Sequence, residues 1–125
     1  MELNELEVYM ISMNLSEKIW NIVKRWSFFE KDTVGKQLIR SSDSVSANIS
    51  EGYGRFHFKD AKMFLYYSRG SLYETKTWLK KAVDRKLIEP DEYNELVERY
   101  TKLAVKLNNY IRAIGNTNSS GSNNQ

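Results

Sequence analysis

A helical repeat of apolar and small side chains constrains the fold of this chain more than any other feature. Over residues 61–82 these side chains recur at steps of four and three residues, and over residues 93–114 at steps of three and four. Such steps place them on one face of an α-helix, whereas a half-buried strand would alternate every second residue. One proline and six glycines in 125 residues also leave too few turns for an all-β sandwich. We therefore expect an all-α fold.

The repeat predicts four helices, at about residues 4–26, 33–51, 58–86 and 90–114. Long amphipathic helices with short connectors favour an antiparallel up-down-up-down four-helix bundle. The expected core positions, in chain order, are Leu6, Tyr9, Met13, Ile19, Trp20, Val23 and Trp26; Val34, Leu38, Ser42, Val45 and Ile49; Ala61, Leu65, Ser68, Leu72, Thr75, Leu79 and Ala82; and Tyr93, Leu96, Tyr100, Leu103, Leu107, Tyr110 and Ile114.

Capping residues suggest where these helices begin and end. Asp32 offers an N-cap side chain for the second helix, and Gly52 stands where a left-handed C-cap glycine would end it. Pro90 suits the first position of the last helix, which we expect to end at Gly115. The domain would thus span residues 1–115. The remaining ten residues, all Asn, Ser, Thr, Gly or Gln, predict a disordered C-terminal tail over residues 116–125.

The second predicted helix is unusually rich in serine, which lowers intrinsic helix propensity. We expect compensation from a closely packed neighbouring helix or from hydroxyl hydrogen bonds to the preceding turn. The serines of this segment are Ser41, Ser42, Ser44, Ser46 and Ser50.

Several classes of function lack the residues they need. The chain has no cysteine and a single histidine, His57, which excludes a disulfide scaffold, a thiolate metal site and a histidine-rich metal site. It also lacks a glycine-rich phosphate loop and a nucleophile elbow. No apolar run approaches the ~20 residues that span a bilayer. We therefore expect a cytoplasmic protein that is not an enzyme and has no catalytic residue, metal or cofactor.

Charge is unevenly distributed, and residues 33–86 carry eleven basic but only five acidic side chains. Within the third predicted helix, cations and tyrosines share one face beside the core stripe, at steps of three and four. Interleaved cations and aromatic rings are typical of surfaces that bind nucleic acid. The alternative is a solvated flank whose lysines pair with acidic residues of the neighbouring helix. The members of this basic stripe are Lys59, Lys62, Tyr66, Arg69, Tyr73, Lys76 and Lys80.

Two further groups of residues remain once the core is assigned. Phe64, Tyr67 and Trp78 widen the apolar arc of the third helix on the side away from the basic stripe. An arc wider than about 100° predicts a subunit interface, with a wide core as the alternative. We expect residues near the 52–57 connection to form a polar structural junction or a pocket. We favour the junction, with these residues bonded to one another or to nearby backbone, because buried polar groups usually satisfy backbone groups and one another. Its members are Asn48, Glu51, Gly52 and Arg55.

Two segments carry a resemblance to a known family. Residues 32–55, DTVGKQLIRSSDSVSANISEGYGR, and residues 68–75, SRGSLYET, resemble the two signatures of the four-helix-bundle proteins encoded in intervening sequences of bacterial 23S ribosomal RNA genes. Many members have proline where this chain has Ser46, and an arginine pair where it has Ile39 and Arg40. The isoleucine removes one cation from that face.

The resemblance implies a four-helix bundle that assembles into a ring-like homopentamer. It also implies nucleic-acid binding, because related accessory proteins of diversity-generating retroelements bind nucleic acid and a reverse transcriptase through basic surfaces. The family has no established catalytic residues and mostly no known biochemical role. Two functions therefore stay open: an oligomeric adaptor that binds RNA or single-stranded DNA, and a protein-binding or structural scaffold without affinity for nucleic acid.

Overall fold

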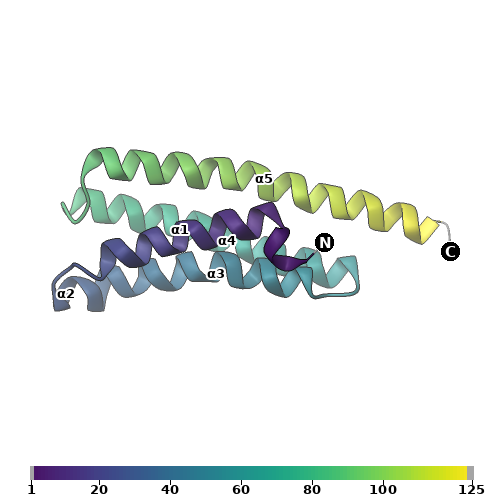
Figure 1. Cartoon of the computed structure of the whole chain (residues 1–125), viewed down its shortest axis with the longest axis horizontal. Coiled ribbons are helices and arrows are strands. Elements are labelled where there is room, and N and C mark those ends of the chain that lie inside the picture. The colour runs from purple at the N-terminus through teal and green to yellow at the C-terminus, as the bar shows by residue number, and fades with distance from the viewer. Residues whose placement is uncertain (1, 124–125) are drawn as a thin grey trace.

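The structure, a computed structural model, describes residues 2–123, with the backbone alone described for Asn4 and residues 117–123 (Figure 1). Every regular element among these residues is helical. In chain order they are the 3₁₀ turn η1 (Leu3–Glu5), α1 (Glu7–Val23), α2 (Phe28–Glu30), the π-helical turn η2 (Lys31–Gly35), α3 (Lys36–Tyr53), α4 (Phe58–Asp84) and α5 (Pro90–Asn123).

The four long helices form an antiparallel bundle, as the repeat predicted. Contacts join α1 to α3, α3 to α4, α4 to α5 and α5 back to α1, so each helix packs against its neighbours in the chain and the ring of four closes (Figure 1). The connection between α3 and α4 lies at one end of the bundle, and α2 lies at the other. Within residues 2–123, no helix is long and apolar enough to cross a membrane.

The predicted core is confirmed along α3 and α4, where every expected position is buried. It is partly wrong along α1. Met13 and Trp20 are exposed, whereas Ser12, Leu15 and Ser16 are buried. The two serine hydroxyls donate hydrogen bonds to the carbonyls of Tyr9 and Met13, at 2.8 and 2.9 Å. Because these hydroxyls are satisfied within their own helix, small serines can be buried and the larger side chains are left outside.

Three of the five serines of α3 behave as predicted. Ser41, Ser42 and Ser46 are buried, and each hydroxyl donates to the carbonyl three residues before it, at 3.2–3.3 Å. Their small size lets α3 pack closely, and its most extensive contact is with α4.

The turn between α1 and α3 differs from the prediction. The helical chain restarts at Phe28, and its N-cap is Ser27 rather than Asp32. The Ser27 Oγ accepts from the Glu30 amide at 3.3 Å, and the Ser27 amide donates to Glu30 Oε1 at 3.0 Å. This reciprocal pair is a capping box, whose Ser-x-x-Glu pattern is present in the sequence. Asp32 instead forms an exposed ion pair with Lys36, so it caps nothing.

The predicted glycine caps are also wrong, because no described glycine has a positive φ. Gly52 lies within α3, where a Cβ would come 3.1 Å from both the Ala61 carbonyl oxygen and Leu65 Cγ. Gly115 lies within α5, where a Cβ would come 2.9 Å from the Phe58 ring. Both glycines therefore serve close packing against α4 and not chain reversal.

The last helix begins at Pro90 as predicted, but it does not end at Gly115, since α5 continues to Asn123. The predicted disorder of the tail, residues 116–125, rests on a segment most of which lies outside the described residues: side chains are undescribed beyond Asn116, and residues 124–125 entirely.

Candidate nucleic-acid interface

The basic stripe runs along α4 beside α5. Arg69 Nη1 donates to Asn108 Oδ1 and Lys76 Nζ donates to Thr101 Oγ1, both at 2.9 Å. These bonds attach the middle of the stripe to α5 and fix the direction in which the two cations point. Lys59, Tyr66, Tyr73 and Lys80 are exposed, and the other members are half-buried.

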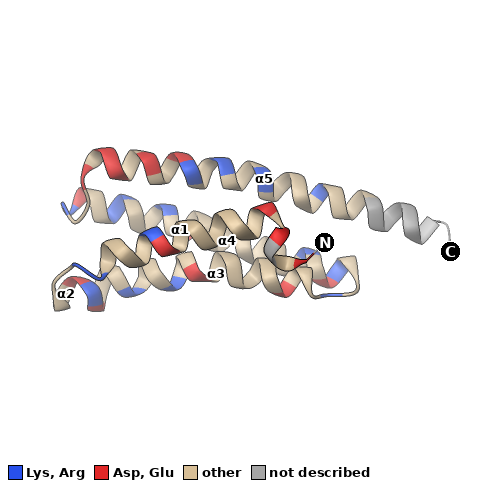
Figure 2. Ribbon diagram, in the orientation of Figure 1, with Lys and Arg blue, Asp and Glu red and all other residues tan. Residues whose placement is uncertain are grey.

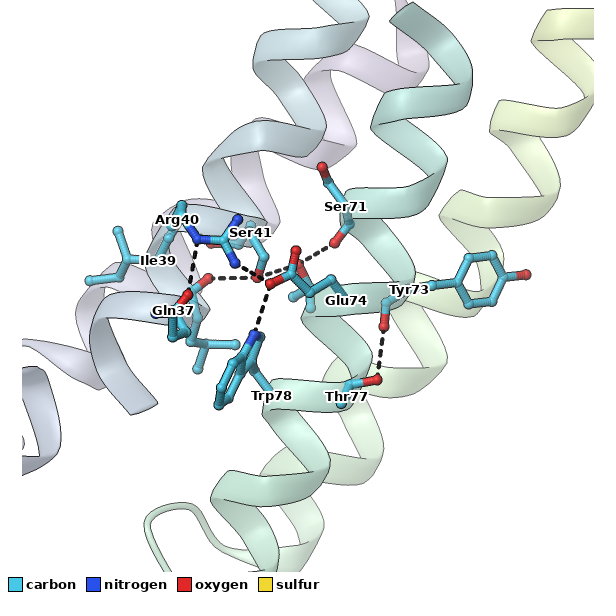
Figure 3. Close-up of polar contacts among 12 residues, drawn as sticks. Gln37, Ile39, Arg40, Ser41, Ser71, Tyr73, Glu74, Thr77 and Trp78 are labelled. Atoms are coloured by element: carbon cyan, nitrogen blue, oxygen red, sulfur yellow. Dashed lines mark hydrogen bonds and ion pairs between the residues drawn. The ribbon is translucent and has the colours of Figure 1, made fainter. Parts of the chain in front are cut away.

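Cations and tyrosine rings of the stripe contact one another. Lys62 Nζ lies 5.5 Å and Arg69 Cζ 4.6 Å from the centre of the Tyr66 ring. Lys76 Nζ lies 5.5 Å from the Tyr73 ring centre. Cation–π contacts of this kind hold the rings and the charges together on one surface. Figure 3 shows Tyr73 pointing to the opposite side of α4 from Glu74, away from α3.

Counter-charges along the stripe are scarce. Lys80 pairs with Asp84 of its own helix at 2.9 Å, and hydrogen bonding to that carboxylate raises the pKa of Lys80. Among the described residues, Lys59, Lys62, Arg69 and Lys76 form no ion pair. The groups that α5 presents to the stripe, Asn108 and Thr101, are neutral. Figure 2 shows the acidic residues of α5 gathered at its N-terminal turns. The structure thus does not provide the acidic partners on the neighbouring helix that the alternative interpretation requires.

The predicted interface residues lie on the flank of α4 away from the basic stripe. The Phe64 ring meets the Tyr67 ring edge-on, with centroids 5.9 Å apart, and the Arg55 guanidinium lies 4.6 Å above Phe64. Trp78 Nε1 donates to Glu74 Oε2 at 3.0 Å. Phe64 and Trp78 are half-buried within the single chain, whereas Tyr67 is 54% exposed.

The two signature segments meet between α3 and α4. Arg40, from the first segment, forms an ion pair with Glu74, from the second, and Figure 3 shows both side chains reaching into the gap between the helices. The Thr75 and Ser41 hydroxyls are hydrogen-bonded at 3.0 Å, and Ser68 Oγ donates to the Val45 carbonyl at 2.7 Å. These polar contacts fasten one helix to the other.

Glu74 is the centre of this cluster. The hydrogen bond from Arg40, and then that from Trp78, lowers the pKa of the Glu74 carboxyl. The contact between the two segments is not evident from the sequence, because Arg40 and Glu74 both lie outside the predicted core stripes of their helices. Their pairing depends on the register of α3 against α4, which neither segment contains by itself.

The residues of the predicted junction are only partly brought together. Glu51 Oε2 and Arg55 Nη2 form an ion pair at 3.0 Å, and Gly52 packs against α4. Asn48 donates instead to the Ser44 carbonyl one turn back, at 2.9 Å. In the part of the chain that the structure describes, no three or more His, Asp or Glu side chains gather in a way that could hold a metal ion.

Comparisons with known proteins agree with this arrangement. The solved structure of a protein of unknown function from the S23 ribosomal protein family of Bacteroides thetaiotaomicron superposes with a TM-score of 0.75 at 24% identity, covering 83% of this chain and 97% of that one. No curated protein matches the chain. The family model for the 23S rRNA-intervening sequence protein matches residues 4–109, which include all of α1, α3 and α4 and residues 90–109 of α5. The chain therefore belongs to the 23S rRNA-intervening sequence protein family.

Proposed function

We propose that this chain is a non-enzymatic, oligomeric helical bundle that binds RNA or single-stranded DNA through the basic stripe of α4. The observation that carries the proposal is the set of four cations, Lys59, Lys62, Arg69 and Lys76, that have no ion-pair partner among the described residues. Like charges held along one line repel one another unless counter-charges or an anionic partner are present.

The geometry of the stripe suits a phosphate backbone better than a base sequence. Lysine and arginine on phosphate oxygens recognise charge, and such contacts carry no base preference. Tyr66 and Tyr73 are exposed enough to add base stacking, although cations already lie over their rings. We therefore expect affinity that depends weakly on sequence and strongly on salt.

Assembly into a ring of about five subunits, which the family resemblance implies, would repeat the stripe in every subunit. Weak phosphate contacts then act together through effective concentration. One feature of α4 supports a contact between subunits. Gly70 is exposed in the middle of the helix, and a Cβ there would meet nothing within 4 Å. A glycine at such a position weakens the helix and relieves no crowding in the single chain, so its place suggests the close approach of another chain.

The stripe is tested with a triple variant, Lys62→Ala, Arg69→Ala and Lys76→Ala. Binding to a labelled single-stranded oligonucleotide is measured by fluorescence anisotropy over a range of salt concentrations. The logarithm of the association constant should depend less steeply on the logarithm of salt, by about 2, because each lost phosphate contact removes about 0.7 from the slope.

The matched control replaces Arg99, Lys102 and Lys106 with alanine. It removes the same charge, but each of these cations already has a carboxylate partner. Equal losses in both triple variants would show that net charge alone matters. If the wild-type protein binds neither RNA nor single-stranded DNA at low salt, the nucleic-acid proposal is wrong and the protein-binding scaffold remains.

A further inference from the structure

A second candidate site lies away from the basic stripe, where the end of α1 meets the start of α3. It is a pocket of about 230 Å³ lined by Trp20, Val23, Lys24, Lys31 and Ile39. Val23 is buried and Ile39 half-buried, so they give the pocket an apolar floor. Trp20 is 51% exposed and provides an aromatic wall.

A highly exposed aromatic ring lies on the same turn as Lys31 of this pocket. Phe28 is 82% exposed and precedes Lys31 by three residues, which places both on the same face of the turn. The capping box formed by Ser27 and Glu30 holds this turn in place, so the ring is presented by an ordered backbone. A phenylalanine this exposed contributes little to the stability of the single chain, so its ring is accessible to a ligand.

The charges at the rim indicate what the pocket would bind. Lys24 and Lys31 are exposed, and within the described residues neither forms an ion pair. Their stems line the pocket, which leaves the ammonium groups at its edge. The apolar pocket with its aromatic wall suits an aromatic ring, and the two unpaired cations at its rim suit phosphates attached to that ring. An apolar side chain of another protein would fill the pocket but would leave both cations without a partner.

We propose that this pocket receives one unpaired nucleobase, stacked between Trp20 and Phe28, with the adjoining phosphates on Lys24 and Lys31. The proposal rests on the proposed function and narrows it. A base inside a duplex is already stacked and paired, so a site of this kind selects single-stranded nucleic acid.

The test compares two oligonucleotides of equal charge, each about 15 nucleotides long, a length near the upper end of known single-strand site sizes. One is oligo(dT), and the other has the same backbone with abasic sites throughout. Wild-type protein should bind oligo(dT) at least about five-fold more tightly, since stacking of a single base is worth that ratio or more. The double variant Trp20→Ala/Phe28→Ala should lose most of this preference and keep only what stacking on Tyr66 and Tyr73 contributes. Phe28→Ala alone, which disturbs no core residue, should reduce the ratio by less.

Phe56→Ala is the matched control, because Phe56 is 92% exposed on the connection at the opposite end of the bundle (Figure 1). It should keep the wild-type ratio. Equal wild-type affinity for both oligonucleotides overturns the base pocket while leaving the basic stripe intact, whereas no binding of either at low salt refutes the proposed function itself. A preference that is undiminished in the double variant also overturns the pocket. If that variant in addition sediments as a smaller species, a neighbouring subunit covers the site.

Discussion

At the scale of single residues, the least satisfied group described is the phenol of Tyr100. Its side chain is fully buried in the core, and within the described residues its hydroxyl has no hydrogen-bond partner. Burial, together with the nearby Asp43 carboxylate, raises the pKa of Tyr100. A buried hydroxyl without a partner lowers stability by about 1–3 kcal/mol relative to an apolar group of the same shape.

We expect Tyr100→Phe to stabilise the folded chain by about 1 kcal/mol, because it removes the unpaired hydroxyl and keeps the ring. Urea denaturation followed by circular dichroism measures the change. A loss of 1 kcal/mol or more would mean instead that the hydroxyl has a partner, such as a bound water molecule. Tyr100→Leu tests the ring itself and should be destabilising.

Lys86 has a backbone conformation that is unfavourable for a residue with a side chain. It has φ +62° after the end of α4, where the Lys86 amide donates to the Val83 carbonyl and the Leu87 amide donates to the Ala82 carbonyl. These bonds form a Schellman motif, in which glycine is preferred because it adopts a positive φ without strain.

Lys86→Gly should therefore stabilise the chain by about 1 kcal/mol. The substitution relieves the strain of the left-handed conformation, and the greater conformational entropy of glycine in the unfolded chain offsets part of that gain. Thermal unfolding provides the measurement. The adjacent change Arg85→Gly is the control, since Arg85 has φ −91° and gains no such relief. Equal effects at both positions would contradict the explanation.

At the scale of elements, the polar cluster around Glu74 joins α3 to α4 and makes stability depend on pH. Because the folded chain holds the pKa of Glu74 below its usual value of 4.5, the carboxylate contributes stability at pH values above 4.5. This contribution is lost as the pH falls through the lowered pKa. The side chain is partly exposed, so solvent weakens the effect.

Glu74→Gln should accordingly reduce stability at pH 7 and have a smaller effect at pH 3. Free energies of unfolding measured in urea across this range provide the comparison. Glu98→Gln, which breaks an exposed pair within α5, is the control and should change stability little at either pH. If the loss caused by Glu74→Gln were equal at pH 3 and pH 7, Glu74 would act through packing and not through its charge.

At the scale of the whole molecule, α4 carries both the surface that we propose for nucleic-acid binding and the residues that we predict for a subunit interface. One flank carries the basic stripe and the other carries Phe64, Tyr67 and Trp78, while Gly70 lies exposed between them. If a neighbouring subunit covers this helix near Gly70, a larger side chain there should have opposite effects on the two stabilities. The folded chain should become more stable, and the assembly should become less stable.

Gly70→Ala should stabilise the single chain by about 1 kcal/mol, the usual gain in an exposed helix interior, and weaken the assembly. Sedimentation velocity at several protein concentrations, together with urea denaturation, gives both quantities. Tyr67→Glu should dissociate the assembly without stabilising the single chain. Val105→Glu, at an equally exposed apolar position on α5, is the control and should leave the assembly intact. A wild-type protein that sediments only as a 14.7 kDa species would remove the basis for a subunit interface.

The all-α bundle and most of its core can be predicted from the amino-acid sequence alone. The repeat in α3, α4 and α5 specifies one buried face per helix, because an apolar side chain has the same preference wherever the helix is placed. Local hydrogen bonding is also encoded locally: the Ser-x-x-Glu pattern of the capping box at Ser27 and Glu30 is present in the sequence, although the cap that we predict from the sequence is Asp32. In α1 the prediction placed the large side chains Met13 and Trp20 in the core, and both are exposed. Serines are buried there because their hydroxyls bond to carbonyls of their own helix.

Which helix surfaces face one another, in contrast, becomes known only from the assembled bundle. The pairing of Arg40 with Glu74, the placement of Gly52 and Gly115 against α4, and the neutral partners of the basic stripe on α5 all depend on the register between helices. Register is set by the packing of the whole core, and no single segment carries it. For the same reason the pocket between Trp20 and Ile39, which joins residues nineteen positions apart from two helices, could be found only after the bundle was assembled.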